Sequence, residues 1–424
     1  MTKTDIIRAA FRVWGRRLYQ STSLTELAQE LQVTKPALYR HFKHKKALEQ
    51  AMFDTFFDEC ATFLKPHYDK ALASEDKREA LFIMLRGNVD YFGHNPDMFL
   101  FSLIQVYGGY KRGEIPPNRF RSLGIDMEAL KLCFDRDETT YPSVLQLVLA
   151  TSTFWVARFH KDGLHGDECS SARLTYSTLS SGADKDALLG QLALFIEEKV
   201  AHGLGFDRER VEPLDYARLE TLAQSGVITR LGDATVAERL LKAVASAVAE
   251  VGPWNVSMEM VARRAGLSKS GLYAHFKNRQ DMLTRLFLTE FDRIVEYAEA
   301  AMRSSDVPVE KLYLAIASIA DYLRSNSEIL ITLDWLRTRR IELRLTMPPS
   351  LYHIFSDFHF GEDTLTRTLF DEEPERVCVP QWILFLLVNT LMQRPDGIDF
   401  ANVSNESIRV LFRFITCGIG GFHV

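Results

Sequence analysis

The sequence predicts an all-α fold with two tandem units, each a three-helix helix-turn-helix domain followed by a helical bundle. Three observations predict this architecture. One segment near the start of the chain recurs in its second half, apolar residues keep helical spacing almost throughout, and no stretch shows the apolar-polar alternation of a half-buried strand. The 424 residues are enough for roughly two to three ordinary domains.

The internal repeat is the clearest feature of the sequence. The stretch SLTELAQELQVTKPALYRHFKHKKAL, which starts at Ser23, recurs as SMEMVARRAGLSKSGLYAHFKNRQDML, which starts at Ser257. The alignment that pairs Tyr39 with Tyr273, here called the head register, needs no gap across the stretch. Other identities in the head register are Ala28 with Ala262, Lys35 with Lys269, Leu38 with Leu272, His41 with His275, Phe42 with Phe276 and Lys43 with Lys277.

The ends of the two units also correspond. His202-Gly203-Leu204-Gly205 aligns with Cys417-Gly418-Ile419-Gly420 in a second alignment, here called the tail register, which makes the second unit shorter in its middle. We therefore predict helix-turn-helix domains at 1–50 and 234–284, helical bundles at 51–206 and 285–424, and a connector at 207–233. The connector contains Pro213 and the helix-like LDYARLETLAQ.

Helical spacing and capping residues define the start of each unit. Ser23 and Glu26 form a capping box, Thr34 and Ser268 are expected to cap the next helix, and Pro36 fits its first turn. Each start is therefore predicted as helix, helix, short turn, helix. The first two helices have apolar faces made of Ile6, Ala10, Val13 and Trp14, and of Leu24, Leu27, Ala28 and Leu31.

Global charge decides little, but its local distribution is informative. The net charge is -5, whereas residues 35–46 and 263–279 contain no Asp or Glu. In an acidic protein this bias predicts contact with phosphate, and two helices joined by a short turn are suited to binding the major groove of a DNA duplex. The basic residues are Lys35, Arg40, Lys43, Lys45 and Lys46, and Arg263, Arg264, Lys269, Lys277 and Arg279.

VTKPALYRHFKHKKAL and LSKSGLYAHFKNRQDML closely resemble the recognition-helix signature of TetR-type repressors, over about 47 residues at the start of each unit. The resemblance implies a double-stranded DNA operator, a small-molecule effector and dimerisation through helix pairs. It implies that base edges face Lys35, Pro36, Ala37 and Arg40 in the first unit, and Lys269, Ser270, Gly271 and Ala274 in the second. Thr34 and Ser268, the expected caps of these helices, are also predicted to be DNA-binding residues. Phosphates would be held by Tyr39, His41, Lys43 and Lys45, with Tyr273, His275, Lys277 and Arg279. Core positions would be Leu38, Phe42, Leu272 and Phe276.

The first unit departs from the family pattern at two positions. Leu18 and Gln32 stand where the second unit has Gly252 and Gly266. Either Gln32 adopts a left-handed turn, at a cost of roughly 1–2 kcal/mol, or the turn is remodelled. DNA binding by the first unit is therefore expected to be less secure than by the second.

Other sites are not expected. The chain has no nucleophile elbow, P-loop, dinucleotide fingerprint or metal cluster, so we predict no enzyme, cofactor or metal site. The five cysteines show no Cys-x-x-Cys pair, and the longest apolar stretch, 382–392, is too short to span a bilayer. We expect a reduced, cytoplasmic, nucleoid-associated protein without a membrane span. Phe154, Trp155, His160, Trp335, Trp382 and Asn389 could line an effector pocket, although ordinary core is the preferred interpretation.

We predict a ligand-responsive repressor in which the two fused units pair as an intramolecular pseudodimer. The alternative assembly is a homodimer of two chains. The alternative function is a small-molecule sensor or protein-interaction module in which one or both heads no longer bind DNA. LQLVLATSTFWVARF and QWILFLLVNTLM, with the helices that follow them, could supply the dimerisation surfaces.

Overall fold

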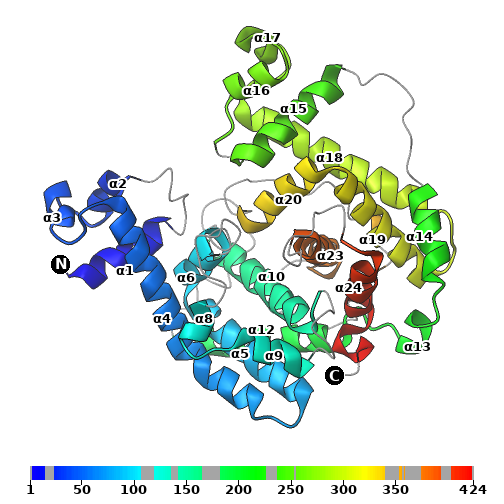
Figure 1. Cartoon of the computed structure of the whole chain (residues 1–424), viewed down its shortest axis with the longest axis horizontal. Helices are drawn as coiled ribbons and strands as arrows, with labels where there is room; N and C mark the ends of the chain where they lie inside the picture. The colour runs from blue at the N-terminus through cyan, green and yellow to red at the C-terminus, as the bar shows by residue number, and fades with distance from the viewer. Residues whose placement is uncertain are drawn as a thin grey trace. The chain divides into compact units, whose positions relative to one another are not determined.

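The structure is a computed structural model (Figure 1) that describes residues 2–14, 23–106, 119–134, 142–164, 182–225, 236–252, 255–339, 353–355, 358, 374–392 and 403–422. These residues form helices, turns and loops, with no strand among them, which confirms the all-α prediction. None of their helices is long and apolar enough to cross a membrane. The chain divides into two compact units, Met1–Glu138 with Ser152–Glu197, and Thr139–Thr151 with Glu198–His423.

The first compact unit opens with a short three-helix segment, here called the first head, and continues into longer helices. The first head comprises α1 (Lys3–Trp14), α2 (Leu24–Glu30) and α3 (Lys35–Tyr39). The body comprises α4 (Lys45–Leu72), α5 (Lys77–His94), α6 (Pro96–Phe101), a π-helical turn (Ser102–Val106), α8 (Arg119–Ser122), α9 (Met127–Phe134) and most of α10 (Val144–Leu164) and α12 (Gly182–His202).

The second compact unit repeats this order after two additional helices. These are α13 (Arg208–Val211) and α14 (Tyr216–Ser225), of which α14 confirms the helix expected in the connector. The second head comprises α15 (Val236–Val251), α16 (Met258–Arg264) and α17 (Lys269–Tyr273). Its body comprises α18 (Arg279–Met302), α19 (Pro308–Ser325), α20 (Ser327–Arg339), α23 (Pro374–Met392), α24 (Asn405–Cys417) and a 3-10 turn (Gly418–Gly421), together with the start of α10 and the end of α12.

The repeat extends beyond the helix-turn-helix motif into the bodies. Helices α5 and α19 have the same length, and Asn95 and Asn326 are the C-cap residues that follow them. The alignment that pairs these two asparagines is here called the body register. Each asparagine donates a side-chain hydrogen bond to the carbonyl oxygen four positions earlier, at 2.7 Å in α5 and 2.8 Å in α19. Helices α4 and α18 keep the head register in their buried faces: Leu48 and Met282, Met52 and Leu286, Phe57 and Phe291, Cys60 and Ile294, and Ala61 and Val295.

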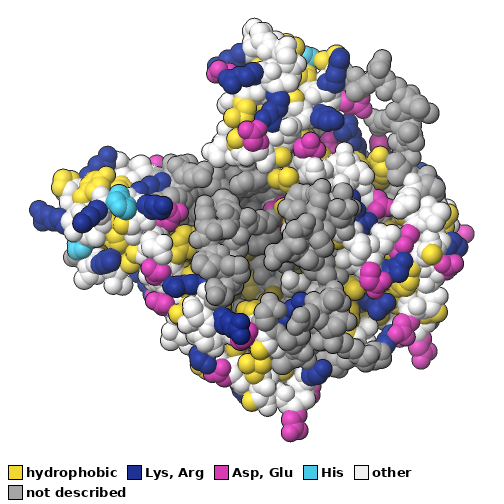
Figure 2. Space-filling view, viewed as in Figure 1, with side chains coloured by type: hydrophobic (Ala, Val, Ile, Leu, Met, Phe, Trp, Pro, Cys, Tyr) yellow, Lys and Arg dark blue, Asp and Glu magenta, His cyan; other side chains and the backbone are white. Residues whose placement is uncertain are grey.

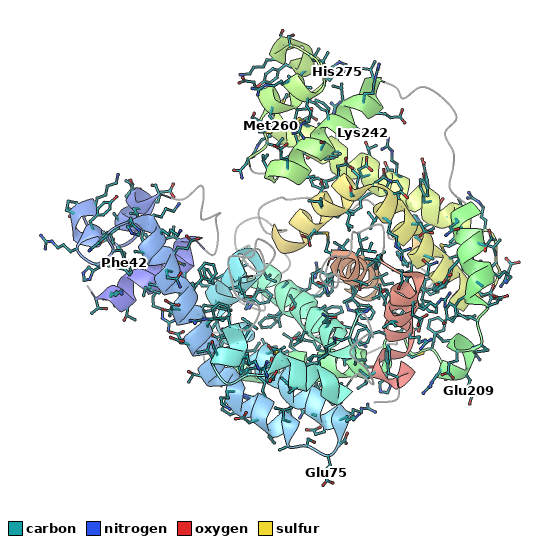
Figure 3. All side chains as sticks on the ribbon, in the orientation of Figure 1. Phe42, Glu75, Glu209, Lys242, Met260 and His275 are labelled. Carbon is teal, nitrogen blue, oxygen red and sulfur yellow. The ribbon has the colours of Figure 1, made fainter. Side chains whose placement is uncertain are left out.

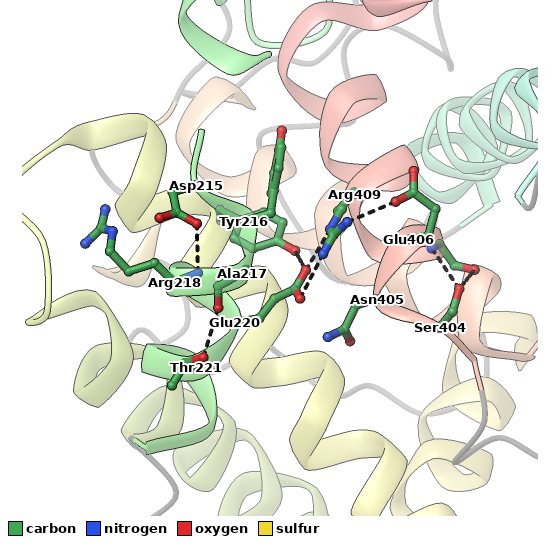
Figure 4. Close-up of polar contacts among 12 residues, drawn as sticks. Asp215, Tyr216, Ala217, Arg218, Glu220, Thr221, Ser404, Asn405, Glu406 and Arg409 are labelled. Atoms are coloured by element: carbon green, nitrogen blue, oxygen red, sulfur yellow. Dashed lines mark hydrogen bonds and ion pairs between the residues drawn. The ribbon is translucent and has the colours of Figure 1, made fainter. Parts of the chain in front are cut away.

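Helix α14 is fixed to the second body by one polar cluster, drawn in Figure 4, and one aromatic cluster. The Glu220 carboxylate accepts hydrogen bonds from the Arg409 guanidinium at 2.8 and 3.0 Å and from the Tyr313 hydroxyl at 2.8 Å. The Tyr216 ring meets the Tyr313 ring edge-on at 4.9 Å, and the Arg409 guanidinium lies 5.4 Å from the Tyr216 ring centroid. A segment between the two repeats is therefore an integral part of the second unit.

Most of the effector-pocket candidates are core residues. Phe154, Trp155, His160, Trp382 and Asn389 are all at most 4% exposed, which supports the core interpretation. The Trp155 ring packs edge-on against Phe195 at 4.7 Å, and Trp382 Nε1 donates to Thr151 Oγ1 at 3.3 Å. The side chain of Trp335 lies outside the described residues. Cys60 and Cys417, the cysteines whose side chains the structure describes, are buried free thiols.

His160 is a buried imidazole in the first unit. Its Nε2 atom lies 2.8 Å from the carbonyl oxygen of Phe92, and because a carbonyl can only accept, this nitrogen carries the proton. Burial lowers the pKa of His160 to about 4, and the hydrogen bond to Phe92 opposes this shift. The folded unit therefore holds a neutral histidine.

Acidification is expected to destabilise the first unit through His160. As the pH falls, the unfolded chain binds the proton before the folded one, because the folded pKa of about 4 lies below the ordinary value of 6.5. The stabilisation present above the ordinary pKa is lost progressively down to the folded pKa, and at about pH 5 the loss is on the order of 2 kcal/mol. Urea unfolding at neutral pH and at about pH 5 measures it. His160→Gln, which can still donate to the carbonyl but does not titrate, should lose less stability, and an equal loss in both proteins would contradict this assignment.

Candidate nucleic-acid interface

The second helix of each head begins at a serine cap. The Ser23 hydroxyl accepts from the amide of Glu26 at 3.3 Å, and the Glu26 carboxylate accepts from the amide of Ser23 at 3.4 Å, which confirms the predicted capping box. In the second head the Ser257 hydroxyl accepts from the amide of Met260 at 3.2 Å. Both caps satisfy amides that the first turn of a helix leaves unpaired.

The turn before each recognition helix requires a left-handed residue. Gly266 has a φ of +67° and Gln32 has a φ of +53°, so Gln32 adopts the left-handed conformation and the turn keeps its shape. The amides of Val33 and Leu267 then return to the carbonyls of Ala28 and Ala262, at 2.8 and 2.9 Å. The first head therefore accepts a backbone cost of about 1–2 kcal/mol to preserve the turn. Leu18, the other departure from the family pattern, lies outside the described residues.

The recognition helices α3 and α17 are five residues long, and each is anchored by a buried leucine and a buried phenylalanine. Leu38, Phe42, Leu272 and Phe276 are at most 4% exposed, which confirms their predicted core role. A cation covers each phenylalanine: Lys3 Nζ lies 5.2 Å from the Phe42 ring centroid, and the Arg285 guanidinium 5.8 Å from that of Phe276. Figure 3 labels Phe42 in the first head and His275 in the second.

The capping prediction for these helices is right for one head and wrong for the other. The Ser268 hydroxyl accepts from the amide of Gly271 at 3.0 Å. Thr34 makes no side-chain cap bond. The equivalent amide in the first head, that of Ala37, donates to the backbone carbonyl of Thr34 at 3.0 Å. The two heads therefore differ in this side-chain cap, although both have the amide that would complete it.

Most of the predicted DNA-binding side chains are solvent-exposed. Tyr39 and Tyr273, at equivalent positions, are 49% and 47% exposed, which is unusual for large aromatic rings. Ala37, Lys45 and Gly271 are partly buried. The remaining exposed candidates are Thr34, Lys35, Pro36, Arg40, His41 and Lys43, and Ser268, Lys269, Ser270, Ala274, His275, Lys277 and Arg279. Both heads therefore present most of the predicted residues at a surface. Figure 2 shows Lys and Arg side chains on the surface of both heads.

The basic residues divide into paired and unpaired charges. Arg264 forms an ion pair with Glu250 and donates to the Ser246 hydroxyl at 2.8 Å, so this cation is engaged within its own head. Burial lowers the pKa of Lys45, and the nearby Glu49 and Glu26 oppose the shift. The side chains with no hydrogen-bond or ion-pair partner among the described residues include Lys35, Arg40, Lys43 and Lys269. The first head thus presents more uncompensated positive charge than the second.

An open hollow on the second head brings three predicted residues together. Lys269, Tyr273 and Arg279 line it, beside the first turn of α16. Glu259, which is not among the predicted DNA-binding residues, also lines the hollow. The head register places Thr25 at the equivalent position of the first head. This difference between the two repeats is visible in the sequence and points to Glu259. A carboxylate there repels phosphate, or accepts a hydrogen bond from a cytosine amino group.

The comparisons with known proteins agree with this geometry. Residues 6–52 and 240–286 match the family described as bacterial regulatory proteins, tetR family. The Fatty acid metabolism regulator protein of Bacillus subtilis is 27% identical over 107 residues, which are 25% of this chain and 55% of that protein. HTH-type transcriptional regulator TtgR of Pseudomonas putida is 34% identical over 83 residues, 20% of this chain and 37% of that protein. The chain thus spans between about a third and just over half of the length of these relatives.

Two solved structures are also similar. The fatty acid degradation regulator FadR from Bacillus halodurans has 19% identity and a TM-score of 0.35, covering 45% of this chain and 98% of that one. FadR from Bacillus subtilis, in complex with stearoyl-CoA, has 18% identity and a TM-score of 0.30, covering 44% of this chain and 98% of that one. The two matches to the tetR family coincide with the two heads. The chain therefore carries two tandem helix-turn-helix segments of the tetR family.

Proposed function

We propose that this protein is a sequence-specific DNA-binding transcriptional regulator, and that its two heads act as an intramolecular pseudodimer on one operator. The observation that carries the proposal is the pair of recognition helices, α3 and α17, anchored in the same register and presenting exposed residues. Each helix projects its first residues away from a buried leucine, as a major-groove helix must.

The exposed residues suit two kinds of contact. Lys35 and Arg40 in the first head are unpaired donors, among the described residues, on the recognition helix or at its end, and an arginine there can bind guanine O6 and N7 in a bidentate manner. Tyr39 and Lys43 in the first head, and Tyr273 in the second, are exposed and suit contacts to phosphate. Phosphate contacts fix the position of a protein along the DNA without specifying the base sequence. A gel-shift assay on promoter DNA from the protein's own locus tests the proposal. A shifted band supports DNA binding, whereas no shift favours the alternative of a sensor without DNA binding.

The closing helices support the pseudodimer. A Cβ on Gly203 would come closer than 3.0 Å to the carbonyl oxygen of Ile415, and a Cβ on Gly418 would come equally close to that of Val200. These contacts are reciprocal. In the tail register Gly203 aligns with Gly418, and Val200 aligns with Ile415. Each glycine therefore approaches the residue that lies three positions before the other glycine. Such reciprocity is the signature of a twofold interface between equivalent surfaces. Here it joins the ends of α12 and α24 in one chain.

A small-molecule effector would act on this pair of heads through the bodies. A ligand that binds one arrangement of the helices more tightly shifts the population toward it and changes the spacing of the heads. The names of the Bacillus relatives make stearoyl-CoA the first compound to test. Release of operator DNA by the compound would identify a repressor response.

Replacing Lys43 with alanine is expected to weaken binding to all DNA sequences alike. One phosphate contact is lost, so the slope of log affinity against log salt concentration should fall by about one. Titration at several salt concentrations measures it. Lys65→Ala is the matched control, because Lys65 lies on the body helix α4 and pairs with Asp69 at 2.6 Å. In a background with Lys269→Ala and Tyr273→Ala, an unchanged affinity for Lys43→Ala would show that the first head does not bind DNA.

The operator is expected to be an imperfect palindrome. Arg40 in the first head is replaced by Ala274 in the second, and a bidentate contact to guanine discriminates by about 1–3 kcal/mol. Arg40→Ala should therefore relax base preference in one half-site only. Selection from random duplexes measures this for both proteins, and recovery of a symmetric palindrome by the unmodified protein would favour two chains that each use one equivalent head.

Adding one methyl group at Gly203 is expected to disrupt the crossing of the closing helices. Gly203 and Gly205 both have positive φ, +57° and +77°, but a Cβ on Gly205 would meet nothing within 4 Å. Gly205→Ala therefore isolates the backbone cost of about 1–2 kcal/mol, and Gly203→Ala should destabilise further in urea unfolding. Light scattering of the unmodified protein should give 48.5 kDa. Equal losses from both substitutions, or a stable mass near twice that of one chain, would contradict the pseudodimer.

A further inference from the structure

The joint between head and body in the second unit contains a buried carboxylate. Glu290, on α18, is 2% exposed. It accepts a hydrogen bond from the Tyr322 hydroxyl of α19 and another from Arg293 Nη1 at 2.9 Å. Arg293 Nη2 also lies 3.6 Å from Glu238 of α15, the first helix of the head. A continuous polar relay thus runs from the body helix α19 through α18 to the head, along helices labelled in Figure 1.

The same joint in the first unit has no buried carboxylate among its described residues, and its ion pair, between Arg8 of α1 and Glu59 of α4 at 2.6 Å, is exposed to solvent. The head register places Phe56 at the position of Glu290, and the body register places Tyr91 at that of Tyr322. The Phe56 ring contacts Phe101 of α6 at 5.6 Å, and Phe101 meets Phe11 of α1 edge-on at 5.0 Å. The hydroxyl of Tyr91 is buried and has no hydrogen-bond partner among the described residues. An aromatic cluster and an exposed ion pair therefore stand where the second unit has its buried relay.

The two joints respond differently to the loss of one contact. A buried carboxylate is tolerated only while its partners compensate for its lost hydration, so removing a single partner is costly. Burial raises the pKa of Glu290, and Tyr322 and Arg293 oppose the shift, so these two groups compensate part of the lost hydration. Aromatic packing instead spreads its stabilisation over many weak contacts, so it depends less on any single partner. The position of the second head therefore depends on the buried carboxylate and its partners in addition to the apolar face of α15. The first head has apolar packing and an exposed ion pair, and no buried charge in the part of this joint that the structure describes.

We propose that Glu290 is a positioning residue that fixes the second head to its body through Tyr322 and Arg293, and that displacement of α19 releases the second head while the first head stays fixed. The two DNA-binding heads of this chain would then respond unequally to one effector. The link to DNA rests on the proposed function, but the mechanical coupling between α19 and the head does not.

Tyr322→Phe tests the coupling in the full chain, because it removes the hydroxyl and keeps the ring that packs against Tyr297 at 4.9 Å. Amide hydrogen exchange of α15 to α17 should accelerate about tenfold, the effect of losing a hydrogen bond to a charged group. Exchange of α1 to α3 should not change. Tyr91→Phe is the matched control, and since its hydroxyl has no partner among the described residues, neither head should change.

Glu290→Gln provides a second variant that keeps an acceptor for Tyr322. It should accelerate exchange in the second head less than Glu290→Ala does, since only the charge on the relay is lost. The proposal is overturned if Tyr322→Phe leaves the second head unchanged, if it affects both heads equally, or if exchange rises as much in α18 and α19 as in the head. Failure of every variant and of the unmodified protein to bind DNA would reject the proposed function, and the exchange data would still decide the coupling.

Discussion

The presentation of both heads depends on one packing constraint, the apolar anchor beneath a five-residue recognition helix. A helix of this length does not persist in water by itself, because its nucleation cost is not recovered within so few residues. Leu38 and Phe42, with Leu272 and Phe276, supply the missing stability by burial. Since the anchors occupy one face, the residues between them are forced outward. The exposure of Tyr39 and Tyr273 is thus a consequence of the anchors.

Local features of this arrangement are predictable from the sequence, and contacts between distant residues are not. The capping box at Ser23 and the left-handed Gln32 follow from short-range rules, and both are present. The ion pair of Arg264 with Glu250 is not predictable in this way, because it depends on how α15 and α16 pack. The cap predicted at Thr34 is absent although the amide of Ala37 is present, so the short-range rule was wrong at this position. The alignment of the two repeats changes from the head register to the body register after α4. Pairs such as Tyr91 and Tyr322 are therefore identified from the helix ends in the structure and not from the sequence repeat.

Fusion of two copies in one chain permits differences that a homodimer cannot hold. In a symmetric pair every substitution appears twice, and a change that improves one half-site contact alters the other as well. Here Arg40 corresponds to Ala274 across the repeat, Thr25 to Glu259, and Phe56 to Glu290. The three substitutions lie at the predicted base-contacting surface, the hollow and the joint. Asymmetry is therefore distributed over several positions of the repeat.

The proposed pseudodimer rests on the backbone crossing of the closing helices α12 and α24. Two separate chains must supply all of their association free energy from the interface, whereas a tethered pair meets at an effective concentration set by the connector. The crossing at Gly203 and Gly418 is a close backbone approach that any side chain would block. The amides of Leu204 and Phe206 extend it by donating to the carbonyls of Ile415 and Thr416 at 2.8 and 3.0 Å. The connector helix α14 also packs on the second body and adds contacts of its own. In the proposed pseudodimer the two copies could therefore diverge elsewhere without losing their pairing.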